Sequence, residues 1–464
     1  MSSKYVIHTR QVPDRFNALT KSGIIAWEEG CLKCAVCVKK QCVYGVYDKR
    51  GLDPRQMIDS IDNQCMNCYR CVQSCPKELI HKSINPEFKA MGDTHWTPDI
   101  IARLWYQAQT GKIPVSGAGY PGPFTGPGFD SMWTDMSEIV RPTRDGIHGR
   151  EYISTSIDIG SIPKQLAFSD KGELVGEEPV VLEIPVPIIF RLPSFGSISE
   201  NTLMGWAMAA RHLGVLMALP YNMIKGDLEG YKANLIPIFG ADDKVASLGD
   251  EIRMVKAIWD GNNKRLLDRV KKSYPNALIV VSIPLAKDSF EEVIGLIHDG
   301  YSIFNLEGTF QGRSADDQSR FVKDDLRAIH QSLVREGIRN EVTLMSSGGF
   351  AMAEHVAKAV ICGVDGVFID FPILIALECR MCRRCEKGLP CPVEIENAPP
   401  RWVAARTENI MGAWHNQLLE IMGAMGIREA RRLRGEAGRA MFFEELDREI
   451  FGTMDKPEEG LELE

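Results

Sequence analysis

Twelve of the thirteen cysteines of this chain fall into three short segments, each with three cysteines separated by two residues and a fourth a few residues later. Three thiolates at this spacing hold three corners of an iron–sulfur cubane from one loop, and the fourth ligand comes from farther along the chain. The sequence therefore predicts three [4Fe–4S] clusters and a protein that handles electrons. The expected ligands are Cys31, Cys34, Cys37 and Cys42 in the first segment, Cys65, Cys68, Cys71 and Cys75 in the second, and Cys379, Cys382, Cys385 and Cys391 in the third.

Structural zinc and a disulfide framework are the alternatives to clusters. Zinc sites commonly use two separated C-x2-C pairs, whereas each segment here packs three cysteines together. Disulfides persist in oxidising compartments, and the start of the chain, MSSKYVIHTR, contains no apolar signal segment. We therefore expect a cytoplasmic protein in which iron–sulfur clusters occupy these cysteines.

The first two segments are close enough in sequence to form a two-cluster ferredoxin-like domain. In such domains the fourth cysteine of each segment usually binds the other cluster. This rule pairs Cys75 with the first three cysteines and Cys42 with Cys65, Cys68 and Cys71. One departure is that Val43, and not proline, follows Cys42.

Composition places the chain among ordinary globular proteins. Its 464 residues are 44% hydrophobic with a net charge of −8, and no apolar run approaches the length of a membrane span. No basic stripe stands out, which argues against a nucleic-acid partner.

Short apolar runs separated by helix-length segments begin at residue 183. Continuous apolar strands that alternate with helices are typical of a parallel sheet buried on both faces, and eight of them indicate a (β/α)8 barrel. The expected strands are residues 183–190, 214–220, 234–240, 254–259, 277–284, 301–308, 341–349 and 366–372, of which 254–259 is the weakest candidate.

The loop after the seventh expected strand is a candidate phosphate site. In (β/α)8 barrels the chemistry lies at the carboxyl ends of the strands, and phosphate groups favour the loops after strands seven and eight. Here the seventh strand runs into Ser347, Gly348 and Gly349, whose backbone N–H groups could approach phosphate oxygens. A double glycine after a strand also occurs as an ordinary turn.

The barrel pattern and the third cysteine segment together resemble the synthase core of glutamate synthase. PSFGSISENTLMGWAMAARHLG (193–214) is similar to the strand and helix that open the FMN site of that family, and SSGGFAMAEHVAKAVICGVDGVFID (346–370) to its seventh and eighth units. The resemblance covers about residues 180–450, and the N-terminal cysteines fit the short, archaeal-type subunits with an inserted ferredoxin-like domain.

This resemblance implies a set of FMN contacts. Ser194, Phe195 and Gly196 would lie against the flavin, Ser347, Gly348 and Gly349 on its phosphate, and Asp370 and Phe371 beside it. A strand end followed by a core aromatic is the alternative interpretation of Ser194 and Phe195. The family's third cluster is a three-iron centre with three cysteines, so the additional Cys382 favours a [4Fe–4S] cluster, with [3Fe–4S] as the alternative.

The substrate site departs from the family pattern. Ile283 and Pro284 stand where the family has a lysine in the fifth strand. Glu307, Lys287 and Arg313 lie at or near strand ends and are the candidate catalytic residues, although each could equally be a solvated loop charge.

Two functions follow from these patterns. In the first, the chain is a glutamate synthase-like oxidoreductase that passes electrons through three clusters to FMN and reduces a 2-iminoglutarate-like substrate. In the second, it is the electron-transfer subunit of a larger redox complex, with a different substrate or with FMN as a relay. Either function calls for a ferredoxin or flavoprotein electron donor and favours a hetero-oligomer.

The chain contains no recognisable glutaminase, so a separate glutaminase-like subunit would have to deliver ammonia. The one cysteine outside the segments, Cys362, lies in the apolar stretch AVICGVDG and is expected to be an inert core residue.

The expected domain organisation is a ferredoxin-like domain with an N-terminal extension at 1–90, a connector at 91–180, the FMN barrel with the third cluster at 181–400, and C-terminal helices with an acidic tail at 401–464. The connector contains the glycine- and proline-rich stretch 114–130, and its polar stretch 131–160 is either a salt-bridged connector or a lid. Its cationic residues are Arg141, Arg144, His148 and Arg150.

Overall fold

The computed structural model describes residues 5–16, 19–26, 30–32, 34, 36–46, 65, 68–113, 126–134, 153–161, 167–175 and 180–452. Residues 114–125 and the connector's Arg141, Arg144, His148 and Arg150 lie outside these ranges, so the lid and connector interpretations of this stretch stay predictions. Among the described residues, no helix combines the length and the apolar character needed to cross a bilayer.

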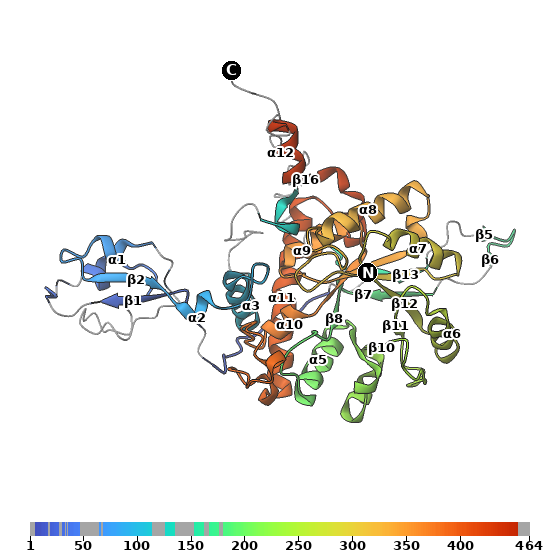
Figure 1. Cartoon of the computed structure of the whole chain (residues 1–464), viewed down its shortest axis with the longest axis horizontal. Coiled ribbons are helices and arrows are strands. Elements are labelled where there is room, and N and C mark those ends of the chain that lie inside the picture. The colour runs from blue at the N-terminus through green and yellow to red at the C-terminus, as the bar shows by residue number, and fades with distance from the viewer. Residues whose placement is uncertain are drawn as a thin grey trace, which may run out of the picture.

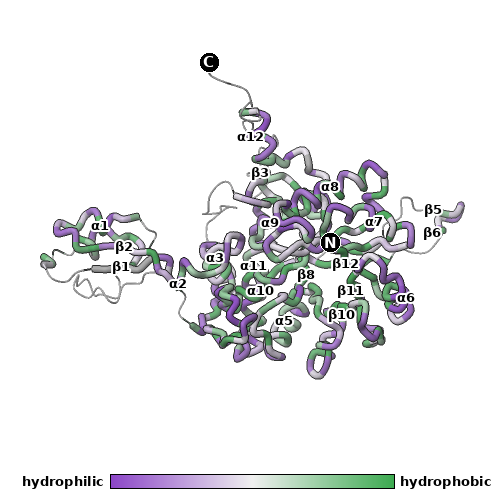
Figure 2. Tube along the Cα trace, viewed as in Figure 1, coloured by the Kyte–Doolittle hydropathy of each residue, from purple (hydrophilic) through white to green (hydrophobic). Residues whose placement is uncertain are grey.

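Eight parallel strands close into a barrel, as the alternation of apolar runs and helices predicts (Figure 1). Neighbouring strands pair in sequence order, and the last strand pairs with the first. Their side chains are almost all buried, and the strands carry most of the hydrophobic positions at the centre of the molecule (Figure 2). The strands are β8 (Ile188–Arg191), β9 (Met217–Pro220), β10 (Leu235–Phe239), β11 (Met254–Ile258), β12 (Leu278–Pro284), β13 (Ile303–Glu307), β14 (Thr343–Ser347) and β15 (Gly366–Ile369).

Two expected strands include residues of another strand or of an α-helix, whereas the remaining strand ends differ from the expectation by at most three residues. The run 183–190 is divided by Pro185 and Pro187: its first part belongs to β7 (Val181–Ile184), which pairs antiparallel with β4 (Ile157–Gly160) outside the barrel. Proline donates no backbone hydrogen bond, so it separates the two strands. At the other end, Phe371 and Pro372 begin helix α10 (Phe371–Ile375) and are not strand residues, because the Asp370 side chain caps this helix by accepting from the Phe371 N–H.

Helices surround the barrel. The first, α5 (Glu200–Leu213), starts with a capping box in which the side chains of Ser199 and Thr202 accept from each other's backbone N–H. The other helices of this layer are the 3₁₀ segments Tyr221–Met223, Gly226–Asn234 and Arg339–Glu341, and α6 (Lys264–Ser273), α7 (Ser289–His298), α8 (Val322–Arg335) and α9 (Ala353–Ile361).

The first two cysteine segments lie in a small unit that projects from the barrel at the left of Figure 1. We call residues 19–90 the cysteine unit. Antiparallel pairing of β1 (Ser22–Ala26) with β2 (Ile80–Ile84) brings its two ends together. Between them lie a π-helical segment (Val36–Gln41) and the short helix α1 (Arg70–Gln73), and α2 (Pro86–Lys89) leads back to the barrel.

Residues 5–16 pack against the barrel domain. The fully buried Arg406 donates from Nη1 to Asp14 Oδ1 at 2.6 Å, and the Asn409 amide donates to the Arg10 carbonyl at 2.6 Å. Both residues lie on the long helix α11 (Pro400–Ala424), which also packs against α3 (Pro98–Thr110), α5 and α9.

The C-terminal region is less helical than the sequence suggests. After α11 come 3₁₀ segments (Ala430–Gly435 and Ala437–Arg439), a strand β16 (Ala440–Phe442) and α12 (Phe443–Phe451). β16 pairs antiparallel with β3 (Met132–Thr134), which follows the 3₁₀ segment Gly128–Ser131. The segment 428–434 contains four arginines, of which Arg431 binds Asp158 and Arg434 binds Asp365.

Candidate functional site

Charged side chains meet at the carboxyl ends of the barrel strands. Glu307 ends β13, and its Oε1 lies 2.5 Å from Arg191 Nη1 at the end of β8 and 3.5 Å from Lys256 Nζ on β11. Neither strand is adjacent to β13, since β12 separates it from β11, and β14 and β15 separate it from β8. The side chains therefore bridge the interior of the barrel and form its mouth.

Hydroxyl and amide groups complete this network. Ser282 Oγ donates to Glu307 Oε2 at 2.9 Å, and Asn305 Nδ2 donates to Ser282 Oγ at 3.0 Å and to Ser347 Oγ at 3.2 Å. Arg191 also donates to Ser347 Oγ at 3.1 Å. The Asn305 Oδ1 atom is buried and has no partner among the described residues, so it is available to a donor on a bound molecule.

Burial and charge act in opposite directions on these groups. Burial lowers the pKa of Lys256 to about 8, although Glu307 favours its charged form. Burial would raise the pKa of Glu307, but Lys256 and Arg191 outweigh it and lower that pKa to about 2. Burial raises the pKa of Asp370, against the attraction of Arg191. At neutral pH the mouth therefore holds Glu307 as an anion and Lys256 close to its titration.

An aromatic layer lies beside this mouth. Phe195 and Phe371 pack with ring centroids 4.6 Å apart, and Phe310 contacts both rings at 5.8 and 5.6 Å. The Arg383 guanidinium, from the third cysteine segment, lies 5.4 Å from the centroids of Phe195 and Phe310. A planar ring system could pack against such a layer. The arginine also joins the third cysteine segment to the barrel mouth.

Close packing against a neighbouring loop is one reason for the double glycine after β14. A side chain on Gly348 or Gly349 would collide with the backbone of residues 308–312, and both glycines have positive φ angles. The two loops can therefore approach each other only without these side chains. The His95 Nε2–H donates to the Gly349 carbonyl at 2.8 Å, and burial lowers the pKa of His95 to about 4, which keeps the ring neutral.

The backbone amides of this loop still fit an anion. Within the described ranges, the N–H groups of Gly349 and Phe350 have no hydrogen-bond partner, although both residues are buried. Buried N–H groups without partners are rare in proteins. A phosphate group would satisfy them.

The four cysteines of the third segment lie close enough to influence one another. Burial raises the pKa of Cys379 to about 12, and the neighbouring thiols of Cys382, Cys391 and Cys385 contribute in the same direction. Cys379 lies four residues after the end of α10, and its carbonyl accepts from Trp105 Nε1 at 3.3 Å. The third cysteine set thus lies next to the eighth strand and the aromatic layer.

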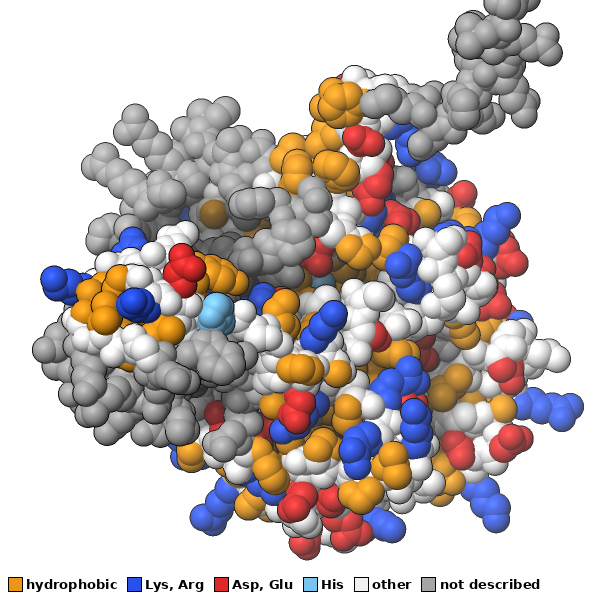
Figure 3. Space-filling view, turned by 60° about the vertical axis from the view of Figure 1, so that its left-hand side comes forward, with side chains coloured by type: hydrophobic (Ala, Val, Ile, Leu, Met, Phe, Trp, Pro, Cys, Tyr) orange, Lys and Arg blue, Asp and Glu red, His pale blue; other side chains and the backbone are white. Residues whose placement is uncertain are grey.

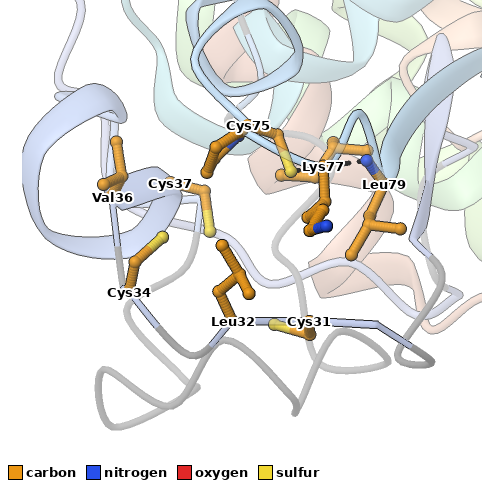
Figure 4. Close-up of a pocket in the computed structure, with 10 residues that line it drawn as sticks. Cys31, Leu32, Cys34, Val36, Cys37, Cys75, Lys77 and Leu79 are labelled. Carbon is orange, nitrogen blue, oxygen red and sulfur yellow. Dashed lines mark hydrogen bonds between the residues drawn. The ribbon is translucent and has the colours of Figure 1, made fainter.

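In the cysteine unit, four thiols line one cavity (Figure 4). The cavity is bounded by Cys31, Cys34, Cys37 and Cys75, with Leu32, Lys77 and Leu79 beside them. This grouping is the one that crossed ligation requires. Cys42, Cys65 and Cys71, like Cys75, pack against a small core of Cys37, Val46 and Ile80. Lys82 Nζ donates to Cys65 Sγ.

In the described part of the chain, no three His, Cys, Asp or Glu side chains converge on one ion-binding point. A cubane differs in that each of its four irons takes one thiolate. Four separated thiols around a cavity fit that requirement.

The chain is similar in sequence to glutamate synthases. Residues 321–428, which run from α8 to α11, match the family model described as the conserved region in glutamate synthase. The archaeal glutamate synthase [NADPH] of Archaeoglobus fulgidus is 25% identical over 92% of this chain and 95% of its own length. The archaeal-type glutamate synthase [NADPH] of Dehalococcoides mccartyi is 25% identical over 88% of this chain and 92% of its own. This chain is a glutamate synthase-like oxidoreductase.

Solved structures show more distant likenesses. The recombinant flavin-binding domain of baker's yeast flavocytochrome b2 superposes with a TM-score of 0.38 and 14% identity, over 68% of this chain and 76% of that domain. Mandelate oxidase with benzoylformic acid gives a TM-score of 0.38 and 13% identity, over 67% and 98%.

In this glutamate synthase-like chain the three candidate catalytic residues are in different surroundings. Glu307 lies at the centre of the mouth network. Lys287 is exposed on the loop after β12, where its backbone N–H donates to Asp316. The Arg313 guanidinium stacks 3.6 Å from the centroid of Phe321 and donates to the Ser319 carbonyl. The contacts of the three residues thus bring only Glu307 into the network.

The expected FMN contacts are also spread over different surroundings. Ser194 is exposed, Phe195 belongs to the aromatic layer, and Gly196 lies against Leu374 of α10. Ser347 is part of the polar network, Phe371 of the aromatic layer, and Asp370 is buried beside Arg191.

Sequence reasoning did not find Lys256, Arg191, Ser282 or Asn305. A signal for Lys256 was present, because a lysine in the middle of the apolar run MVKAI is rarely buried without a partner. This lysine lies in 254–259, the weakest expected strand. The other three residues carry no local signal and become recognisable only when the barrel closes.

Proposed function

We propose that this chain binds FMN at the barrel mouth and three iron–sulfur clusters at its twelve segment cysteines, and that it reduces a 2-iminoglutarate-like substrate. The observation that carries the proposal is the network of Arg191, Lys256 and Glu307 beside the aromatic layer and the third cysteine set. A site of this kind combines a cationic binding surface, a titratable proton carrier and electron-carrier ligands. The relatives named above are glutamate synthases, which supports the choice of substrate class.

The described residues fit FMN. The unpartnered N–H groups of Gly349 and Phe350 would hold its phosphate, and the layer of Phe195, Phe310 and Phe371 would support its ring. When bound, FMN would supply a hydride and the clusters would carry single electrons. The site residues themselves supply binding, orientation and protons.

Lys256 is the residue best placed to move a proton. Its pKa of about 8 lies near neutral pH, where a general acid works most effectively. Glu307 lies 3.5 Å from Lys256 Nζ and holds the ammonium form. Arg191 offers a guanidinium at the same mouth, the preferred partner of a substrate carboxylate.

One observation favours the alternative function, an electron-transfer subunit with another substrate. The cations at the described mouth, Arg191 and Lys256, already face two acidic side chains, Glu307 and Asp370. A dianion such as 2-oxoglutarate would have to compete with these carboxylates. A neutral or singly charged substrate would meet no such competition.

The proposal is tested on protein purified without oxygen. Three four-iron clusters and one flavin give about twelve irons, about twelve sulfides and one FMN per chain, whereas a three-iron third centre lowers the iron content by about one. Reduced ferredoxin, ammonia and 2-oxoglutarate should then yield glutamate. Lys256→Met should lower kcat by about 10²-fold or more with flavin content unchanged.

The same assay distinguishes the two proposed functions. Flavin that is reduced by the clusters but gives no glutamate, and no spectral shift with 2-oxoglutarate, supports the electron-transfer alternative. Zinc in place of iron, or protein without flavin, contradicts both.

A further inference from the structure

We infer that the exposed face of the cysteine unit around Cys34 is the docking site of a small, acidic one-electron carrier protein. The inference rests on the proposed clusters, and it adds the place of docking and the charge of the partner. Three independent properties of this face carry it: its charge, its exposed apolar side chains and the exposure of a cysteine that lines the cavity.

The cysteine unit is basic within an acidic protein. Residues 19–90 contain eleven Lys and Arg and eight Asp and Glu, a net charge of +3 in a chain whose net charge is −8. From residue 30 to residue 84, the described acidic side chains are limited to Glu78. The described cationic side chains of this stretch are Lys40, Arg70, Lys77 and Lys82, of which all but Lys82 are exposed.

Large apolar side chains are also exposed in this stretch of the chain. Leu32 is 58% exposed, Val43 67% and Tyr69 48%. Each lies within one residue of a cysteine of the first two segments. Figure 3 shows the result on the projecting unit, where hydrophobic side chains gather among Lys and Arg side chains. An apolar centre with a charged rim is typical of a protein–protein contact.

The cysteine cavity reaches the surface at this face. Cys34 is exposed, whereas Cys37 beside it is buried, and both line the cavity together with Lys77 (Figure 4). A cluster held there would approach solvent on the Cys34 side. Single-electron transfer between proteins uses small, short-lived contacts, so the exposed edge of a cluster is where a carrier would dock.

The charge distribution of the chain favours an acidic electron-carrier protein. The chain outside residues 19–90 has a net charge of −11, by subtraction of +3 from −8. An acidic protein is repelled by that larger part and attracted by the projecting unit, which orients it during encounter. A basic carrier would be drawn to the barrel instead.

The test measures how fast a reduced acidic [2Fe–2S] ferredoxin bleaches the cluster absorbance of the intact protein in a stopped-flow instrument. Raising the ionic strength from about 10 mM to about 150 mM shortens the Debye length from about 30 Å to about 8 Å. We expect the second-order rate constant to fall at least about tenfold, because steering is screened. Methyl viologen, a small cationic donor, serves as the control for cluster reduction itself.

Double variants of Lys40 and Lys77, with a control on the barrel domain, locate the contact with the carrier. Lys40→Glu with Lys77→Glu should lower the ferredoxin rate about tenfold at low salt, and the neutral pair Lys40→Gln with Lys77→Gln should fall between it and the wild type. The matched control is Lys244→Glu with Lys271→Glu, two exposed lysines on the barrel domain. It carries the same change of charge and should stay within about twofold of the wild-type rate.

Iron content separates docking from cluster loss. Variants that keep their iron and their methyl viologen rate but lose the ferredoxin rate support the docking face. Equal ferredoxin rates for Lys40→Glu with Lys77→Glu and for its barrel control, or a rate that does not depend on salt, would overturn the docking face. Protein without iron, which methyl viologen cannot bleach, would instead contradict the proposed clusters.

Discussion

The barrel and the cysteine unit differ in how far their folding depends on a bound group. The barrel has a large apolar core, and its strands are buried whatever binds at the mouth. The cysteine unit has a separate core whose described buried members are Cys37, Val46 and Ile80. These three residues contribute little against the conformational entropy of ordering the unit. We therefore expect the barrel to fold without a bound group, whereas the cysteine unit would need the proposed clusters to fold.

The largest expected effect follows from this difference. Removing iron with a chelator under reducing conditions should abolish the amide protection of β2 and α1, because metal-binding free energy is folding free energy in small metal domains. Strands β12, β13 and β14 should keep their protection. Hydrogen exchange followed by mass spectrometry measures both regions in one sample.

The cysteines of the third segment provide the control for this experiment. They lie on the barrel domain, so iron loss there should expose only the loop 379–391 and leave α11 protected. A cysteine unit that stays protected without iron would contradict the comparison and point to a sufficient apolar core.

The second prediction concerns the barrel mouth. Glu307→Ala removes the counter-charge of Arg191 and Lys256 and should cost about 3–5 kcal/mol of unfolding free energy, the usual result of leaving buried charges unpaired. Chemical denaturation of the barrel, followed by tryptophan fluorescence, measures this loss. Glu445→Ala is the matched control, because its ion pair with Arg327 is half exposed and should contribute less than about 1 kcal/mol. Equal losses for the two variants would mean that the mouth network is solvated.

The sequence predicts features whose residues are close together in the chain, and it does not predict those whose residues meet only in the fold. The eight strands are recognisable because each is a continuous apolar run, and the cysteine sets because their spacing is local. Arg191, Ser282 and Asn305 lie in three different strands. Ser282 and Asn305 are partners on the neighbouring strands β12 and β13, whereas Arg191 of β8 reaches Ser347, which Asn305 also contacts, only in the closed barrel. No local pattern distinguishes them from other strand residues. Strand β16 was missed for a related reason, since its partner β3 lies some three hundred residues earlier.

The third prediction uses the pH dependence of Lys256. Its pKa is about 8 in the folded protein, below the ordinary lysine value of 10.5, so between these values the unfolded chain binds more protons than the folded one. Stability must then rise with pH across this window. The contribution is on the order of 3 kcal/mol for a shift of this size. Denaturation at pH 7.5 and pH 10.5 should show the rise in the wild type and its loss in Lys256→Met. Parallel pH dependences would mean that Lys256 titrates normally.

The smallest effect is expected at Lys287, and it tests the sequence interpretation against the structure. Lys287 was a candidate because it follows the fifth barrel strand, where the related family has a lysine, but its side chain is exposed and lies outside the mouth network. Lys287→Ala should change stability by less than about 0.5 kcal/mol, the usual range for surface substitutions. Turnover should stay within about twofold of the wild type, while Lys256→Met loses most of it. A large loss of turnover in Lys287→Ala alone would show that the loop after β12 closes over the substrate and that the mouth described above is incomplete without it.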